Sequence, residues 1–406
     1  MDNKDKLKIS IIIPLRNSSE VINELISSIN KLKLQPNEVI IIDSSKNILT
    51  EEVINNNLKC KSLYLRVKHA YPGHARNIGV SLAKTELIAF LDSQTIPNPE
   101  WLDRYLHLIQ AYNSDVVFGV TKFNARSSFQ GVLRAATYGM IGHVTVPGTL
   151  FRKNIFFNSN KFLQNVRMGE DIEWRERLIE NGLNIHSPKD SVITYNGLPK
   201  SLYFTLKKYM ISAFHTARLN ILQNVKDIYF SILLILSTII IPKWNHLIGG
   251  WNENPIFIPH VTKIYLISLI ILFLIIQVIK HLFFSNMSKT LFSKTLQIIL
   301  IIFLFMTVMN WNALIAGWVE DTILYMPHIT KLYVGVVAIS SIIYRGLFHP
   351  IKCKVKLSYL FPLKWIQISL LGLLIDLIKA PGYIYGGLIG LIGNIVPFKG
   401  LYKIEN

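Results

Sequence analysis

Acidic side chains stand directly after short apolar runs at two places in the first hundred residues. Asp43 and Asp92 each end such a run, and the pair Glu170-Asp171 begins a segment of helical periodicity. Carboxylate oxygens hold hard cations and accept protons from reacting hydroxyl groups, so all four positions are candidates for chemistry. A simpler interpretation stands beside this one, because Asp is common in strand-end turns and acidic residues favour helix N-termini.

The apolar runs before these carboxylates alternate with segments of helical spacing. Strands are predicted at 9–13, 39–42, 63–67, 87–91 and 116–120, and helices at 21–32, 75–84, 99–111 and 171–181. Strands that alternate with helices form a mainly parallel sheet of the α/β class. Ligands bind outside the carboxyl ends of strands in such sheets, so Asp43 and Asp92 should face one crevice. Residues 122–150 have a less regular pattern.

The second half of the chain is far more apolar than the first. Of the 406 residues, 50% are hydrophobic and only 17% are charged, an average that arises when a soluble part is joined to a very apolar part. Membrane spans are predicted at 227–242, 264–284, 296–318 and 331–348, because a span needs about 20 residues. For the last apolar block, 365–400, a helical hairpin, a re-entrant pair and an interfacial helix are all open.

The formal net charge of +18 is one signature of nucleic acid binding. Much of the Lys and Arg, however, lies beside the apolar runs, where attraction to an anionic leaflet explains it better. Segment 201–220 is amphipathic and basic, as expected of a helix in the membrane interface. Membrane lipids are therefore the expected partner, and nucleic acid is not.

The loops between the predicted spans alternate between basic and less basic, which places the N-terminal part on the cytosolic side. The apolar stretch 9–13 is too short for the core of a signal peptide. Cys60 and Cys353 form neither a metal spacing nor a disulfide framework. We expect a multi-pass protein of the inner or plasma membrane with a cytosolic N-terminal domain.

Several short motifs follow one another in the first half of the chain. They are ISIIIPLRN at 9–17, EVIIIDSS at 38–45, GHARNIGVSLA at 73–83, LIAFLDS at 87–93, PEWL at 99–102 and MGED at 168–171. In this order and spacing they resemble the family 2 glycosyltransferases, whose GT-A fold is a Rossmann-like, mainly parallel sheet with flanking helices. The expected domains are a GT-A domain at 1–200, an interfacial helix or linker at 201–226 and a transmembrane region at 227–406.

The resemblance implies that the donor substrate is a nucleotide-diphosphate sugar. The residues that it assigns to donor binding are Pro14, Arg16, Asn17, Asp43, Ser44, Arg76, Asp92 and Ser93. Asp43 would contact the nucleotide base or ribose. Arg76 would contact the nucleotide or buttress Asp92, although an arginine on a helix is as often a surface residue.

The resemblance also implies the roles in catalysis. Asp171, beside Glu170, is expected to take the proton from the acceptor hydroxyl as general base. The diphosphate leaving group is usually neutralised by Mg²⁺ or Mn²⁺. Family members commonly hold this ion with Asp-x-Asp, whereas the triplet here is Asp92-Ser93-Gln94. The amide oxygen of Gln94 still coordinates a hard cation, but without the charge.

Processive members of the family carry Gln-x-x-Arg-Trp after the catalytic Asp, and none follows Asp171. We therefore expect an inverting, non-processive enzyme that transfers one sugar to a lipid-linked or glycan acceptor during the synthesis of surface glycans or glycolipids. One alternative is a polyprenyl-phosphate glycosyltransferase, in which a nucleophilic phosphate makes Asp171 dispensable. Another is an inactive GT-A scaffold for a membrane partner. A transporter is disfavoured, because the predicted spans lack a charged pathway.

Overall fold

The computed structural model describes residues 7–17, 21–45, 54, 57–157, 161–219 and 341–395. The chain divides into two compact units, residues 1–221 with 341–406 and residues 222–340, and every described residue belongs to the first. The spans predicted at 227–242, 264–284 and 296–318, and the part of 331–348 before residue 341, lie outside the described residues. Residues 341–395 belong to the same unit as the N-terminal domain, which differs from the expected boundary at residue 227.

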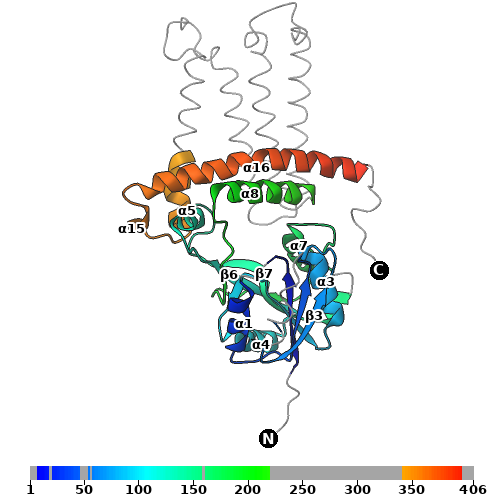
Figure 1. Ribbon diagram of the computed structural model, residues 1–406. Coiled ribbons are helices and arrows are strands. Elements are labelled where there is room, and N and C mark those ends of the chain that lie inside the picture. The colour runs from blue at the N-terminus through cyan, green and yellow to red at the C-terminus, as the bar shows by residue number, and fades with distance from the viewer. Residues whose placement is uncertain are drawn as a thin grey trace, which may run out of the picture. The chain divides into compact units, whose positions relative to one another are not determined.

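A mixed sheet forms the centre of the N-terminal domain (Figure 1). Its strands are β1 (Ile9–Leu15), β2 (Glu38–Asp43), β3 (Lys61–Arg66), β4 (Leu87–Phe90), β5 (Thr95–Pro97), β6 (Val116–Phe123), β7 (His143–Arg152), β8 (Ile185–His186) and β9 (Ile193–Tyr195). They follow the order β3-β2-β1-β4-β7-β6-β9-β5, and β8 pairs with β6. The first four are parallel, and β7 is antiparallel to β4 and β6. The predicted α/β class is confirmed.

Helices cover both faces of the sheet. They are α1 (Ile22–Asn30) and α4 (Trp101–Ala111) on one face and α3 (Pro72–Leu82) and α7 (Glu170–Glu180) on the other. The same domain contains the helices α5 (Ser128–Thr137) and α6 (Asn154–Phe157). Side chains alternate along a strand: Ile11 and Ile13 of β1 enter the core beneath α1 and α4, whereas Ile12 enters the core beneath α3 and α7. Burial on both faces explains why β1 is apolar at nearly every position, with the buried Ser10 as the exception.

Segment 122–150, which lacks a regular pattern in the sequence, contains α5 and most of β7. The side chain of Ser127 caps α5 by accepting a hydrogen bond from the backbone N–H of Gln130. The interpretation of this segment as less regular is therefore wrong. Its strand β7 pairs with β4 on one side and β6 on the other, and so connects the parallel strands to the rest of the sheet.

Two long helices, α8 (Leu202–Arg218) and α16 (Lys364–Ile395), lie side by side (Figure 1). Two glycines allow their close approach. A Cβ atom added at Gly382 would lie 2.7 Å from the backbone oxygen of Met210, and one at Gly386 would lie 2.2 Å from that of Phe214. Ala213 and Ala217 are buried on the facing side of α8.

The C-terminal apolar block is one helix over its described part, so the hairpin and the re-entrant pair are wrong for residues 364–395. Among the described helices, α16 is the one that is long and apolar enough, over Lys364–Gly387, to cross a membrane. It is preceded by η1 (Tyr344–Phe348), α14 (His349–Lys352) and α15 (Leu357–Leu360). Part of its apolar surface packs against α5 in a small separate core.

Candidate active site

A cavity of about 660 Å³ lies at the carboxyl ends of β1 and β4. Its walls come from these strand ends, from α3, from β7, from the start of α7 and from α8. Nine of the residues singled out in the sequence line it: Pro14, Arg16, Ser44, Arg76, Asp92, Ser93, Gln94, Glu170 and Asp171. Segments more than a hundred residues apart in the sequence therefore meet in one place.

Asp43 and Asn17 are not among the lining residues. The carboxylate of Asp43 is fully buried and accepts hydrogen bonds from the backbone N–H of Ser45 and the hydroxyl of Tyr64, both at 2.7 Å. Asn17 has φ of 50°, and its backbone N–H donates to Ser45 Oγ at 2.7 Å. Asp43 thus links the ends of β2 and β3, and of Asp43 and its neighbour Ser44 it is Ser44 that lines the cavity.

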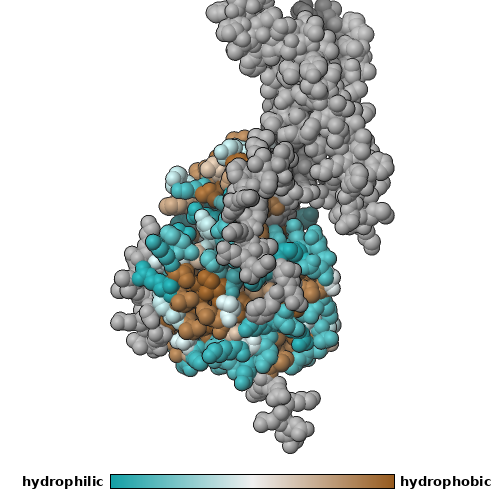
Figure 2. Space-filling model, turned by 90° about the vertical axis from the view of Figure 1, so that its right-hand side faces the viewer, coloured by the Kyte–Doolittle hydropathy of each residue, from teal (hydrophilic) through white to brown (hydrophobic). Residues whose placement is uncertain are grey.

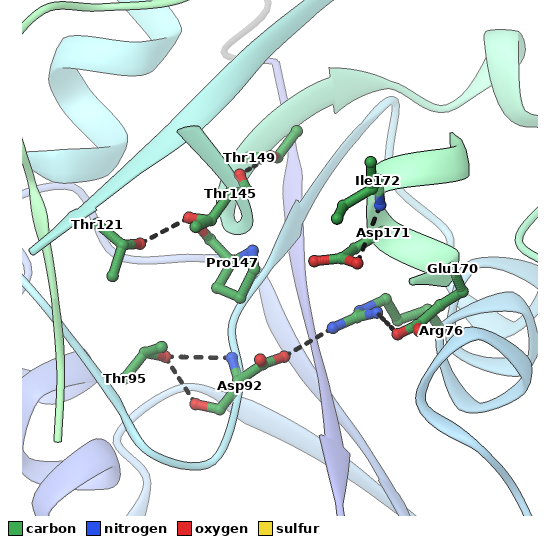
Figure 3. A network of polar contacts seen from close by, with 10 residues as sticks. All are labelled: Arg76, Asp92, Thr95, Thr121, Thr145, Pro147, Thr149, Glu170, Asp171 and Ile172. Atoms are coloured by element: carbon green, nitrogen blue, oxygen red, sulfur yellow. Dashed lines mark hydrogen bonds and ion pairs between the residues drawn. The ribbon is translucent and has the colours of Figure 1, made fainter. Parts of the chain in front are cut away.

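Arg76 connects the carboxylates of the cavity (Figure 3). Its Nη2 donates to Asp92 Oδ1 at 2.8 Å and its Nη1 to Glu170 Oε1 at 3.1 Å, with only 3% of the side chain exposed. The guanidinium carbon also lies 5.9 Å from the centre of the Phe90 ring and 5.3 Å from that of Phe162. Of the roles considered for Arg76, the structure shows the buttress of Asp92.

Close packing of α3 fixes the position of Arg76. Pro72 starts the helix, and Gly79 lies directly on β1. A Cβ atom at Gly79 would stand 2.3 Å from Ile12 Cγ2, so a larger residue would push the helix away. Two residues of the 73–83 motif therefore act together. Gly79 allows α3 to pack closely on β1, and Arg76 lines the cavity from the same helix.

The pair Glu170-Asp171 enters the cavity from the first turn of α7. The residue before it, Gly169, has φ of +92°, a conformation that residues with a Cβ rarely adopt. Asp171 lines the cavity, and its Oδ1 accepts a hydrogen bond from the backbone N–H of Ile172 at 2.9 Å (Figure 3).

Three carboxylates share one buried cation at this site. Burial, and then the negative charge of Asp171, raises the pKa of Glu170 to about 8, although Arg76 acts in the opposite direction. A protonated Glu170 at neutral pH lowers the negative charge beside Asp92 and Asp171. The two neighbours Glu170 and Asp171 therefore have different environments, which is how enzymes separate the roles of paired carboxylates.

The residues at the expected metal position fit a divalent cation. Asp92 Oδ1 is occupied by Arg76, but the second oxygen of Asp92 and the amide oxygen of Gln94 belong to cavity-lining residues. Mg²⁺ is often held by one or two carboxylates together with substrate phosphates, so these two ligands and a diphosphate make a suitable oxygen set. Within the described residues, no group of three or more His, Cys, Asp or Glu side chains forms a metal-binding cluster.

One wall of the cavity was missed in the sequence. Lys208, Ser212 and Thr216 of α8 all line the cavity, together with Arg167 from the segment before α7. Their spacing of four residues places the three α8 side chains on one helical face. That polar stripe was visible in the sequence, but the amphipathic pattern of 201–220 was assigned to the membrane interface alone.

The N-terminal domain is similar to known proteins. Residues 10–167 match the family described as Glycosyl transferase family 2. Glycosyltransferase AglE of Haloferax volcanii is 21% identical over 201 residues, which are 45% of this chain and 65% of AglE. Poly(ribitol-phosphate) beta-N-acetylglucosaminyltransferase TarS of Staphylococcus aureus is 30% identical over 116 residues, 27% of this chain and 20% of TarS.

Among solved structures, that of S. aureus TarS 1–349 in complex with UDP-GlcNAc has a TM-score of 0.39 and 21% identity, and covers 51% of this chain and 66% of that chain. The chain spans at most about two thirds of the length of the curated relatives named here, 65% in the case of AglE. The motifs between residues 9 and 102 and the strands β1 to β7 lie within or overlap this matched segment, and Glu170 and Asp171 lie just beyond it. Residues 10–167 are a glycosyl transferase family 2 domain.

Proposed function

We propose that this protein is a membrane-bound, inverting and non-processive glycosyltransferase that moves one sugar from a nucleotide-diphosphate sugar to a lipid-linked or glycan acceptor. The observation that carries the proposal is the meeting of Asp92, Arg76, Glu170 and Asp171 in one cavity of a family 2 domain. A volume of about 660 Å³ is suitable for a small-molecule substrate. The relative TarS forms a complex with UDP-GlcNAc, which is a nucleotide sugar.

In the proposed reaction, the nucleotide lies at the ends of β1 and β2, where Pro14, Arg16 and Ser44 line the cavity. The acceptor oxygen attacks the anomeric carbon from the side opposite the diphosphate, and the bond from that carbon to the diphosphate oxygen breaks. The hydroxyl proton passes to the carboxylate of Asp171. A divalent cation held by Asp92 and Gln94 would neutralise the charge of the departing diphosphate.

Arg76 and Glu170 have positioning roles in this scheme. Arg76 holds Asp92 at 2.8 Å and cannot rotate away, since it is also bound to Glu170 and packed against Phe90 and Phe162. Preorganised groups stabilise developing charge without having to move during the reaction. Glu170 fixes the first turn of α7 and therefore the direction in which Asp171 points.

Membrane attachment is supported by the surface of α16. Ile366, Leu370, Leu374 and Leu377 follow one another at intervals of three or four residues, and between 37% and 72% of each is exposed. An exposed apolar stripe of this kind marks an interaction surface. Figure 2 shows hydrophobic and hydrophilic residues mixed at the upper end of the described part and, below them, a largely hydrophilic surface with hydrophobic patches.

We infer that α16 lies in the membrane interface rather than across the bilayer. Asp376, in the middle of α16, pairs with Arg345 of η1, and a charged pair at the centre of a bilayer is costly. The helix also packs along α8 and α5, and α5 belongs to the water-soluble domain. The proposed location is the inner or plasma membrane, with the family 2 domain on the cytosolic side.

The test offers membranes that contain the full-length protein a panel of radiolabelled nucleotide sugars and a lipid extract. Label transfer that disappears in Asp171→Asn supports the proposed enzyme. Transfer that survives unchanged in Asp171→Asn supports a phosphate nucleophile, which needs no base. Nucleotide binding without transfer or hydrolysis supports a scaffold and contradicts the proposal.

A further inference from the structure

We propose that the wall of the cavity formed by α8 binds a phosphate group of the acceptor, and that the acceptor is a glycan linked to a lipid through a phosphate or diphosphate. This inference rests on the proposed function and names the acceptor class for the same cavity. It is carried by the polar stripe Lys208, Ser212 and Thr216 together with Arg167.

The polar stripe faces away from the helix-packing side of α8. Lys208, Ser212 and Thr216 line the cavity, whereas Ala213 and Ala217 are buried on the side that faces α16. The hydroxyl of Thr216 donates to the backbone oxygen of Ser212 at 2.7 Å, which leaves its oxygen as an acceptor only. Lys208 and the Ser212 hydroxyl are then the donors that α8 presents to a ligand.

Lys208 has no anionic partner among the described residues. The interaction that its Nζ makes is with the ring of Tyr195, 5.8 Å from the ring centre. Burial lowers the pKa of Lys208, which means that the surrounding groups do not compensate for the water that its ammonium loses. A cation held in this way in a cavity gains stability when an anion binds beside it.

Arg167 provides a second cation near the same wall. It lines the cavity and forms no ion pair with a described residue. Its closeness to α8 is visible in His215, whose pKa is lowered by burial and further by Arg218 and Arg167. Arg76, in contrast, is bound to Asp92 and Glu170, whereas neither Lys208 nor Arg167 forms an ion pair with a described residue.

These cations are separated in the chain from the residues that we assign to the donor. The nucleotide end of the cavity has its own cation, Arg16, at the end of β1. Lys208 belongs instead to the helix that packs against α16, whose exposed stripe we propose to meet lipid. The α8 helix itself exposes Tyr203 and Phe204, at 66% and 61%. An anionic head with an apolar tail matches this combination of surfaces.

The experiment measures binding of a fluorescent long-chain polyprenyl monophosphate to the purified full-length protein in detergent. The variants are Lys208→Met, Lys208→Arg and the matched control Lys207→Met, since Lys207 is the exposed neighbour whose Nζ lies over the Tyr203 ring. A charge-assisted hydrogen bond contributes about 1.5–3 kcal/mol, so Lys208→Met should weaken binding about tenfold or more. Lys208→Arg should restore most of the affinity, and Lys207→Met should bind as the wild type does.

The uncharged polyprenol of equal length and methyl phosphate separate the two sources of affinity. Polyprenol should bind more weakly and show no dependence on Lys208. Methyl phosphate that competes as strongly as the lipid phosphate would mean a water-soluble acceptor and would overturn the lipid part of the proposal.

Loss of nucleotide affinity in Lys208→Met, with lipid-phosphate binding intact, would assign Lys208 to the donor and overturn the whole inference. The binding assay requires no sugar transfer, so the two proposals can fail separately. Transfer by the wild type combined with lipid-phosphate binding that ignores Lys208 removes only this inference. Binding that depends on Lys208 without transfer from any donor removes the proposed enzyme.

Discussion

Replacing Arg76 by Met is expected to lower the free energy of unfolding by about 3–5 kcal/mol, the usual cost of removing one partner of a buried ion pair. Only 3% of the Arg76 side chain is exposed, and it binds two carboxylates at 2.8 and 3.1 Å. Methionine keeps an apolar chain between Phe90 and Phe162, so the loss reports mainly on the missing charge. The variant leaves Asp92 and Glu170 facing each other without a cation.

A second substitution tests this explanation. Glu170→Gln alone leaves Arg76 paired with Asp92 and should cost no more than about 1 kcal/mol. In the double variant Arg76→Met/Glu170→Gln only Asp92 is left without its partner, and its side chain is 34% exposed and accessible to water. The double variant should therefore be more stable than Arg76→Met, by about 1–3 kcal/mol. Because the pKa of Glu170 is about 8, this difference should be larger at pH 9 than at pH 6.

Thermal unfolding of the full-length protein in detergent, followed by far-UV circular dichroism, provides the measurement. The matched control is Arg104→Met, which breaks an exposed pair with Asp190 at 3.4 Å, and a surface pair contributes at most about 1 kcal/mol. If Arg76→Met is no more harmful than Arg104→Met, Arg76 does not hold the carboxylates as described. Equal stability of the single and double variants would refute the coupling between Arg76 and Glu170.

Three further outcomes are expected. The pKa of Glu170 in the folded protein is about 8, above its ordinary value of 4.5. Its contribution to stability is therefore complete below pH 4.5 and is lost as the pH rises to 8, so the wild-type unfolding midpoint should fall over this range relative to that of Glu170→Gln. Gly386→Leu should separate α8 from α16 and lower the unfolding midpoint, since its Cβ would meet the Phe214 backbone at 2.2 Å, whereas Gly372→Ala, 3.4 Å from the nearest atom, should be tolerated. Gln94→Asp restores a second carboxylate and should tighten Mn²⁺ binding in titration calorimetry about tenfold or more.

The sequence was most informative where chemistry depends on local motifs. Arg76, Asp92 and Asp171 could be placed in one site because each belongs to a short pattern of residues that shapes its own turn or helix. Asp43 has the same strand-end position as Asp92, but the sequence does not reveal which side chain on the neighbouring strand reaches it. The hydroxyl of Tyr64 on β3 donates a hydrogen bond to the Asp43 carboxylate, which therefore has a partner within the fold.

Contacts between distant segments were the part that could not be predicted. The pairing of α8 with α16 joins residues near 210 to residues near 380, and its specificity comes from Gly382 and Gly386 facing Met210 and Phe214. Two glycines four residues apart are compatible with close helix packing, but they do not identify the partner. Hydropathy therefore indicated that segment 201–220 is amphipathic and that block 365–400 is apolar, but it did not indicate that the two helices pack against each other.

The packing of this layer constrains how an acceptor would reach the cavity. The axes of packed helices lie about 8–10 Å apart, and a helix with its side chains is about 10–12 Å across. With the exposed stripe of α16 at the lipid surface, as we propose, the polar stripe of α8 lies within roughly two helix diameters of that surface, because Gly382 and Gly386 prevent a gap between the helices. Lys208 and Asp171 line the same cavity, so a lipid phosphate bound by Lys208 would lie in the cavity that holds the proposed base. We therefore expect a lipid acceptor to bring its phosphate to the α8 wall of this cavity, where the cation of Lys208 would favour binding over leaving the phosphate in water.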